Sequence, residues 1–395
     1  MIEEKISLRR VIGEYGGKLP GPNLVLLGGV HGNEPAAILA LNHVLETLRR
    51  QQPPAFRGKL IALRGNLPAI SAATRYIDED LNRIWIPELM KPLEASPEYG
   101  TDRTVEQGER RELFRILSPL LEDYHNPLYL VDLHTTSAES PPFVIIADTI
   151  RNRRFARDFP VPIILGLEEQ LEGTILHYLG DLGFRAVAFE AGQHHDPASV
   201  NNHIAAIWIA LAGAGCLQPA ELPGYEQQLH ILRRAAEGLP PVFETRFRYA
   251  IAEGEHFRMK PGYRNFQPIS RGEVLASNHQ GEIRNTSPGN IFMPLYQTKG
   301  DDGYFRIRKV AYFWLIVSEW LRRFHLERML PFLPGIRLNP EIPNELIVNR
   351  RVARWLVLEI FHLLGYRKKR IENGKLIVTK RRYDLHGPEA DAGRD

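Results

Sequence analysis

Cysteine is almost missing from this sequence: Cys216 is the only one in 395 residues. An internal disulfide framework and a zinc cluster built from cysteines are therefore excluded. Apolar runs also stop short of the ~20 residues that a membrane-spanning helix needs, since VAYFWLIVSEWL is interrupted by Glu319. The N-terminus lacks the charged and then apolar pattern of a signal peptide. We therefore expect a cytoplasmic protein without a membrane span.

Net charge is small as well. The chain has 50 Lys and Arg against 47 Asp and Glu, a formal net charge of +3. This balance does not indicate a nucleic-acid binder, and no nucleic-acid partner is expected. Basic residues do gather near the C-terminus, as in TKRRY. Such a cluster is most often a solvated face, and a binding surface for an anionic partner is the alternative.

Three nucleotide-binding or hydrolase motifs are also absent. The sequence has no G-x-G-x-x-G, no G-x-x-x-x-G-K-[ST] and no G-x-S-x-G. These absences matter because LGGVHGNEPA, which starts at Leu27, is a glycine-containing turn after an apolar run. A dinucleotide site, a phosphate loop and a serine nucleophile are thereby removed as explanations of this turn.

The sequence does contain apolar runs that alternate with helical patterns. This alternation indicates an α/β fold with a mixed, mostly parallel sheet and flanking helices. The proline-rich stretch 86–104 is expected to be a long loop. Strands are expected at 23–30, 58–66, 128–137, 143–148, 161–166 and 184–192, and helices at 36–50, 105–124 and 196–215.

The pattern changes near Leu222, and we predict three parts. Residues 1–221 form the α/β domain, which carries the candidate site. Residues 222–310 have short β-like runs between glycine turns and form a β-rich domain. Residues 311–395 form a basic, mainly helical extension, with helices at 311–325 and 349–365 and a short strand at KLIVTK.

His31 and Glu34 stand on the turn after the first apolar run. Imidazole and carboxylate are both zinc ligands, and an H-x-x-E pair that enters a helix can direct both side chains to one ion. The pair alone is weak, because a surface histidine and a first-turn glutamate are equally ordinary. A catalytic zinc needs a third protein ligand and one open position.

Two further strand ends supply candidates for this site. His134 ends an apolar strand, and Asp132 lies two residues earlier on the same strand face, where it can orient the imidazole. Glu190 ends another apolar strand, where a lone carboxylate is costly unless it is paired, liganded or catalytic. We interpret Glu190 as a general base. Structural pairs, Asp132 with His134 or Glu190 with a cation, are the alternatives.

The segment TRYIDEDLNRIW adds Arg75, Asn82 and Arg83. Arginine forks bind carboxylates with two hydrogen bonds and can polarise a carbonyl group. Asp78 and Asp80 are expected to hold these arginines in place. The alternative is a charged loop with internal salt bridges only.

Five motifs occur in the order expected of the succinylglutamate desuccinylase/aspartoacylase family: GGVHGNEPA, RGNLPA, TRYIDEDLNRIW, VDLHTTS and FEAG. The chain resembles this branch of the zinc carboxypeptidase-like hydrolases over about residues 20–310. The resemblance implies a carboxypeptidase-like α/β domain with an appended β domain, and one Zn²⁺ per chain. It also implies hydrolysis of an N-acyl amide.

The resemblance further implies roles for individual residues. His31, Glu34 and His134 match the zinc ligands of the family. Glu190 matches its general acid and base, and Arg75 matches the arginine beside the scissile carbonyl.

Substrate-binding positions are implied in the same way. Asn82 and Arg83 match the pair that grips a substrate carboxylate. Tyr296 is our choice for the tyrosine that closes the site in some members, with Tyr304 as the alternative. One position departs from the pattern, because aspartoacylase has a further arginine where this chain has the region of Gly180.

We therefore predict a zinc-dependent amidohydrolase that deacylates an N-acyl amino acid or a similar small carboxylate. The metal and Glu190 would activate the attacking water. Two alternatives stay open: a zinc carboxypeptidase or peptide amidase with the same centre, and a non-catalytic zinc-binding protein. A homo-oligomer is compatible with the sequence.

Overall fold

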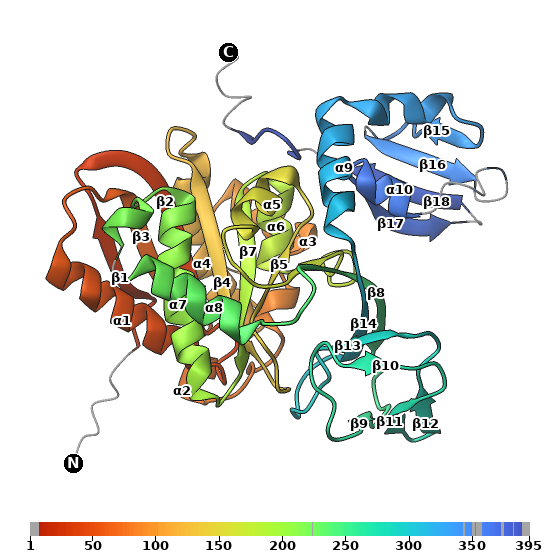
Figure 1. The fold of residues 1–395 in the computed structure, drawn as a ribbon, viewed down its shortest axis with the longest axis horizontal. Helices are drawn as coiled ribbons and strands as arrows, with labels where there is room; N and C mark the ends of the chain where they lie inside the picture. The colour runs from red at the N-terminus through yellow and green to blue at the C-terminus, as the bar shows by residue number, and fades with distance from the viewer. Residues whose placement is uncertain are drawn as a thin grey trace.

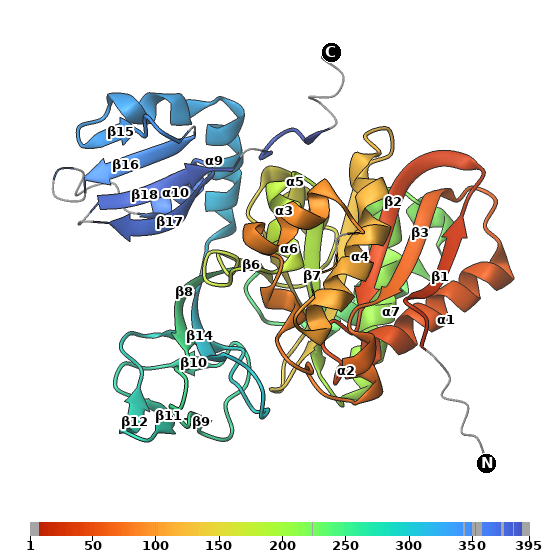
Figure 2. The same ribbon diagram turned by 180° about the vertical axis from the view of Figure 1, so that it is seen from behind.

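The computed structural model describes residues 8–388 except 99, 101, 223, 343, 350, 351, 353–357, 373, 374 and 382. Figures 1 and 2 show a large α/β part, from which a β-rich part and a C-terminal part extend. Among the helices of the described residues, none has the length and apolar character needed to cross a membrane.

An eleven-stranded sheet runs through the α/β part and into the β-rich part, in the order β1-β3-β2-β4-β7-β5-β6-β8-β14-β13-β10. The inner strands β3, β2, β4 and β7 run parallel to one another. The predicted α/β fold with a mixed, mostly parallel central sheet is therefore confirmed. The strands of the α/β part are β1 (Val11–Gly16), β2 (Leu19–Gly28), β3 (Arg57–Arg64), β4 (Leu128–Thr136), β5 (Phe143–Ile146), β6 (Ile163–Leu165) and β7 (Arg185–Gln193).

The β-rich part continues the same sheet with antiparallel strands, and a separate three-stranded sheet in the order β12-β11-β9 packs beside it. Its alternating sequence therefore forms strands, as expected. These strands are β8 (Val242–Ala250), β9 (Arg258–Met259), β10 (Pro268–Ile269), β11 (Val274–Asn278), β12 (Gly281–Arg284), β13 (Gly289–Phe292) and β14 (Asp302–Lys309).

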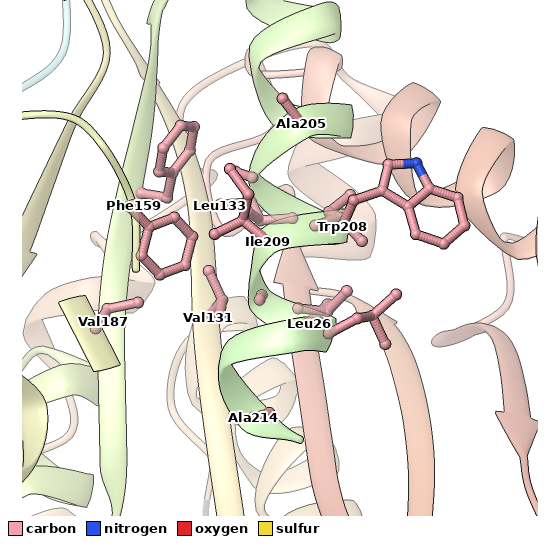
Figure 3. Packing of buried hydrophobic residues seen from close by; sticks show 14 of the residues in the cluster. Leu26, Val131, Leu133, Phe159, Val187, Ala205, Trp208, Ile209 and Ala214 are labelled. Carbon is pink, nitrogen blue, oxygen red and sulfur yellow. The ribbon is translucent and has the colours of Figure 1, made fainter. Parts of the chain in front are cut away.

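Helices cover both faces of the inner strands, which explains why these strands are apolar throughout. α1, α5, α7 and α8 share one buried cluster with the sheet, and α3, α4 and α6 share the other. Figure 3 shows Ile209 of α7 among Val131 and Leu133 of β4. The helices are α1 (Ala36–Gln51), α2 (Leu67–Ser71), η1 (Leu81–Arg83), α3 (Pro87–Ala95), α4 (Val105–Glu122), α5 (Ile150–Ala156), α6 (Ile175–Asp181), α7 (Pro197–Ala214), η2 (Pro219–Glu221) and α8 (Tyr225–Ala235).

Two expectations about this region were wrong in detail. The stretch 86–104 is not all loop, because α3 forms there with Pro87 in its first turn, where proline is tolerated, and buries Met90 and Leu93. The first boundary, after residue 221, lies too early. Helix α8 follows it and buries Leu232 in the cluster that α7 shares, so apolar burial keeps this helix with the α/β part.

The C-terminal part is not mainly helical, contrary to expectation. A four-stranded antiparallel sheet in the order β15-β16-β18-β17 packs there with its own apolar cluster. Short runs such as ELIVN form a strand when a partner strand lies alongside them. The local sequence pattern does not reveal whether such a partner is present. The predicted strand KLIVTK is β18, whereas much of the predicted helix 349–365 lies outside the described residues. The elements are α9 (Tyr312–Arg323), η3 (Leu326–Phe332), β15 (Ile336–Leu338), β16 (Glu345–Asn349), α10 (Leu358–Leu363), β17 (Tyr366–Glu372) and β18 (Lys375–Lys380).

Ionic contacts hold the C-terminal part against both the α/β part and the β-rich part. His362 of α10 lies 3.1 Å from Glu169 and 3.0 Å from Glu244. Burial alone would lower the pKa of His362, but hydrogen bonds to these two carboxylates outweigh it and raise the pKa to about 9. The imidazole is therefore positively charged at neutral pH, where it links the C-terminal part to the other two.

Candidate metal centre

The turn after β2 places His31 and Glu34 at the carboxyl end of the strand. Gly29 ends the strand with a φ of +71°, a left-handed conformation that favours glycine. Gly32 packs directly on α2, because a Cβ there would lie 2.0 Å from the carbonyl carbon of Ala69. A side chain at either position would therefore displace the turn.

The structure brings the three predicted ligands together. β4 is the parallel neighbour of β2, so His134 lies at the same sheet edge as the turn. Glu34 Oε1 lies 2.8 Å from His31 Nδ1, and Glu34 Oε2 lies 3.1 Å from His134 Nδ1. Thr135 N–H donates to the same Oε2 at 2.9 Å. One ligand atom from each of the three residues lies within 4.8 Å of the others, and all three residues are buried.

Each imidazole has a carboxylate on its far side. His31 Nε2 lies 3.2 Å from Asp80 Oδ1, and His134 Nε2 lies 2.8 Å from Asp132 Oδ2. Partners of this kind fix the orientation of a metal-binding imidazole. The contact of Asp132 follows the sequence interpretation. Asp80 holds Arg75 at 2.9 Å, as expected, but its contact with His31 was not foreseen.

These contacts shift the titration of the cluster. Burial alone would raise the pKa of Glu34, but the charges of His31 and His134 hold it well below its usual value. Burial alone would lower the pKa of His134, but Asp132 and Glu34 raise it well above its usual value. The carboxylates therefore favour a cation between them.

The residues fit a divalent metal ion. Glu34, Asp80 and Asp132 are three carboxylates in one buried cluster, and Arg75 is the arginine that faces it. A bound cation would balance this negative charge, which is otherwise costly to bury. Two imidazole nitrogens with one carboxylate are also a donor set of catalytic zinc sites.

Glu190 lies beside this cluster on β7. Its Cα pairs in register with that of His134 on β4. The side chain is buried, and within the described part of the chain its Oε2 has no hydrogen-bond partner. Burial is the main cause that raises the pKa of Glu190 to about 8. Such a carboxyl group can both accept and return a proton near neutral pH.

Another buried carboxylate, Glu106 in the first turn of α4, shapes the loop that carries Arg75. It accepts hydrogen bonds from the backbone N–H groups of Ile77, Asp78 and Glu79 at 2.7, 3.1 and 3.2 Å. Glu106 is completely buried. The sequence did not point to this role, because a glutamate in the first helical turn is ordinary.

Asn82 and Arg83 lie near the cluster but already bind other protein groups. Arg83 Nη2 donates to Asp302 Oδ2 at 2.8 Å, and Asn82 Oδ1 accepts from Ile175 N–H at 3.0 Å. Asp302 begins β14, so its contact with Arg83 joins distant parts of the sequence. No local pattern could have indicated this pair.

The structure does not bring either candidate tyrosine into the cavity beside the cluster. Tyr296 donates its hydroxyl hydrogen to a backbone carbonyl of the β-rich part at 2.8 Å, and Tyr304 is almost fully buried in that part. Gln297 lines this cavity instead. Its Oε1 accepts from Asn33 Nδ2 at 3.0 Å and lies 3.3 Å from His194 Nε2.

A cavity of about 70 Å³ lies between the cluster and the segment that carries Gln297. A larger cavity of about 550 Å³ lies between the α/β part and α9, away from every predicted site residue. The smaller cavity is the candidate active site, because two of its lining residues contact the cluster: Thr135 N–H donates to Glu34, and Arg75 donates to Asp80. Its lining includes Arg75, Arg83, Thr135, His194, Gln297 and Asp302.

Residues 20–207 match the family described as the succinylglutamate desuccinylase/aspartoacylase catalytic domain. The matched part of the chain belongs to this family. The match includes the three clustered ligands, Glu190 and the Arg75–Arg83 segment. The family resemblance inferred from the five motifs is therefore confirmed.

Individual relatives are similar to this chain at low sequence identity. An N-acyl-aromatic-L-amino acid amidohydrolase (carboxylate-forming) of Xenopus laevis is 22% identical over 274 residues, which are 65% of this chain and 86% of the relative. A succinylglutamate desuccinylase of Serratia proteamaculans (strain 568) is 25% identical over 276 residues, or 66% and 76% of the two chains. The crystal structure of succinylglutamate desuccinylase/aspartoacylase from Rhodobacter sphaeroides has a TM-score of 0.54 at 20% identity and covers 75% of this chain and 88% of that one. This structural likeness shows a shared fold.

Proposed function

We propose that this chain is a zinc-dependent amidohydrolase that removes the acyl group from a small N-acyl amino acid. The observation that carries the proposal is the buried cluster of His31, Glu34 and His134 with Glu190 beside it. Family membership supports hydrolysis of an amide, because the Xenopus relative is named an amidohydrolase and the Serratia relative a desuccinylase.

His31, Glu34 and His134 would hold the metal. When bound there, Zn²⁺ supplies Lewis-acid chemistry that acidifies water and polarises a carbonyl group. Glu190 takes the proton of the attacking water while the water oxygen bonds to the carbonyl carbon of the amide. Glu190 then gives this proton to the amide nitrogen as the carbon–nitrogen bond breaks. The products are a carboxylate and an amine.

Arg75 would stabilise the negative charge that develops on the carbonyl oxygen. Asp80 holds its guanidinium group in place at 2.9 Å, so little reorganisation is needed during the reaction. The role of Tyr296 stays a prediction, since its hydroxyl would first have to leave its backbone partner.

The substrate side of the cavity favours a ligand with a single carboxylate. Arg83, with Asn82, is proposed to bind that carboxylate, but Arg83 already shares its charge with Asp302. The further arginine of aspartoacylase is missing from the region of Gly180. Both features reduce the positive charge available to a second carboxylate. The small cavity likewise favours a compact acyl group over a peptide.

Metal analysis and a substrate panel test the proposal together. We expect one zinc per purified chain, complete loss of hydrolysis after chelation, and recovery when Zn²⁺ is added back. The panel contains N-acyl amino acids and, as the comparison, N-blocked dipeptides. Full activity of the metal-free protein would contradict the proposal, and cleavage of the dipeptides alone would favour the carboxypeptidase alternative.

Replacing Asp80 by asparagine tests the outer partner of His31. We expect metal affinity to fall roughly 10- to 100-fold, because the imidazole loses the carboxylate that orients it. Competition with a metal-binding dye measures this affinity directly. The matched control is Asp78→Asn, since Asp78 is exposed and bonds the backbone of Val105. Equal affinities of the two variants would show that Asp80 does not position His31.

A further inference from the structure

Helix α9 carries an apolar stripe on the side that faces solvent. Its opposite side packs on the α/β part through Leu315 and Arg322, and Ser318 donates there to the carbonyl of Leu363 in the C-terminal part. The stripe residues follow spacings of three, four and four, which align them along one face of a helix. We name as the α9 stripe Phe313, Ile316, Trp320 and Phe324, which are 63%, 54%, 59% and 57% exposed.

Exposed apolar residues continue along the chain on both sides of the stripe. The stripe residues and these neighbours together expose an apolar surface on the order of 900 Å². This sum takes a free side chain as roughly 200 Å² and counts half of each as exposed. The largest apolar patch of an ordinary monomer is roughly 300–600 Å². A standard protein interface buries about 800 Å² per partner, so this surface suffices for one. The neighbours are Tyr312, Trp314, Met329, Phe332 and Leu333.

We propose that the α9 stripe is the contact between two copies of this chain, packed antiparallel about a two-fold axis that crosses the stripe midway between Ile316 and Trp320. A stripe along one helix is self-complementary about such an axis. Its spacing is that of helices that pack side by side. Aromatic residues, methionine and arginine are also the types enriched in protein interfaces. The inference is independent of the proposed hydrolysis.

The charge beside the stripe is mixed and not purely cationic. Glu319 lies 3.4, 3.3 and 3.5 Å from Arg154, Arg157 and Arg323, so the arginines beside the stripe share a carboxylate. A membrane-binding helix instead presents cations to the lipid head groups.

Two copies would also not repel each other strongly. Antiparallel packing separates the two Arg323 side chains by ten helical residues, or roughly 15 Å. This exceeds the Debye length of about 8 Å at physiological salt. Each Arg323 would then lie near Phe313 of the second copy, where a cation–π contact is favourable.

Light scattering of the full chain at micromolar concentrations tests the proposal. We expect a particle with twice the chain mass of 45.1 kDa. Trp320→Glu places a charge in the centre of the interface from both copies, so we expect the dimer to dissociate at least 100-fold more readily. The matched control is Tyr124→Glu, an exposed aromatic residue beyond the end of α4, which should stay dimeric.

Phe313→Glu repeats the test at the other end of the stripe, in case Trp320→Glu fails to fold by circular dichroism. A folded monomer from either variant supports the proposal. A wild-type chain that stays monomeric even at concentrations about 100-fold above the micromolar range overturns the proposal. A dimer that survives both substitutions overturns it as well. Wild-type monomers that sediment with vesicles of phosphatidylcholine and phosphatidylglycerol would assign the stripe to a membrane surface instead.

Discussion

Replacing Glu190 by glutamine should lower kcat by roughly 10³-fold while the protein keeps its metal. Glutamine has nearly the same shape but cannot take a proton from water or return it to the leaving amine, and such proton transfers contribute about 10²- to 10⁴-fold. Glu190 is not among the three clustered ligands, so metal content should not change. Steady-state kinetics on the best N-acyl amino acid, with metal analysis of the same sample, measure both quantities.

Glu139→Gln is the matched control for this experiment. Glu139 follows β4 close to the same sheet edge, but it is exposed and pairs with Arg264 at the surface. Its substitution should leave kcat unchanged. A Glu190→Gln enzyme with wild-type turnover would remove Glu190 from the mechanism. Loss of both metal and turnover would instead make it part of the metal site.

Replacing Arg322 by alanine should destabilise the attachment of the C-terminal part by about 3–5 kcal/mol, the usual cost of breaking a buried ion pair. Its side chain is 1% exposed, and its guanidinium group lies 2.9 Å from Asp148 and 3.0 Å from Asp384. Without it, two carboxylates stay buried without this cation. We expect the midpoint of thermal unfolding to fall by roughly 10 °C in calorimetry.

Arg323→Ala provides the control, because the next residue along α9 carries the same charge on the exposed side. Its side chain is 60% exposed and pairs only loosely with Glu319 at 3.5 Å. Exposed pairs contribute little, so the midpoint should move by no more than about 2 °C. If both substitutions lowered the midpoint equally, a contribution common to both positions of α9, and not the buried ion pair, would explain the effect.

These two residues illustrate different limits of sequence reasoning. Glu190 was found because a carboxylate at the end of an apolar strand is unusual, and its position needs no knowledge of partners. Arg322 was missed because arginines near the C-terminus were interpreted as a solvated face. Arg322 and Arg381 are in fact buried against carboxylates of the α/β part. Composition counts charges but does not tell which of them are paired.

The sequence by itself determined the parallel core and the cluster of candidate ligands. Apolar runs identify the inner strands, and parallel strands end at one edge of a sheet, so His31, Glu34, His134 and Glu190 had to meet there. The glycines of LGGVHGNEPA follow from the same local chemistry, because Gly29 adopts a left-handed conformation at the strand end.

Only the tertiary structure decided which residues support and cover that cluster. Asp80 beside His31, Glu106 under its loop and Asp302 on Arg83 are contacts between segments far apart in the chain. The C-terminal sheet arose in the same way, from strands that need a partner to form. Local patterns record how a segment buries its own apolar face, whereas a polar pair depends on where another segment comes to lie. That position is set by the packing of the whole chain.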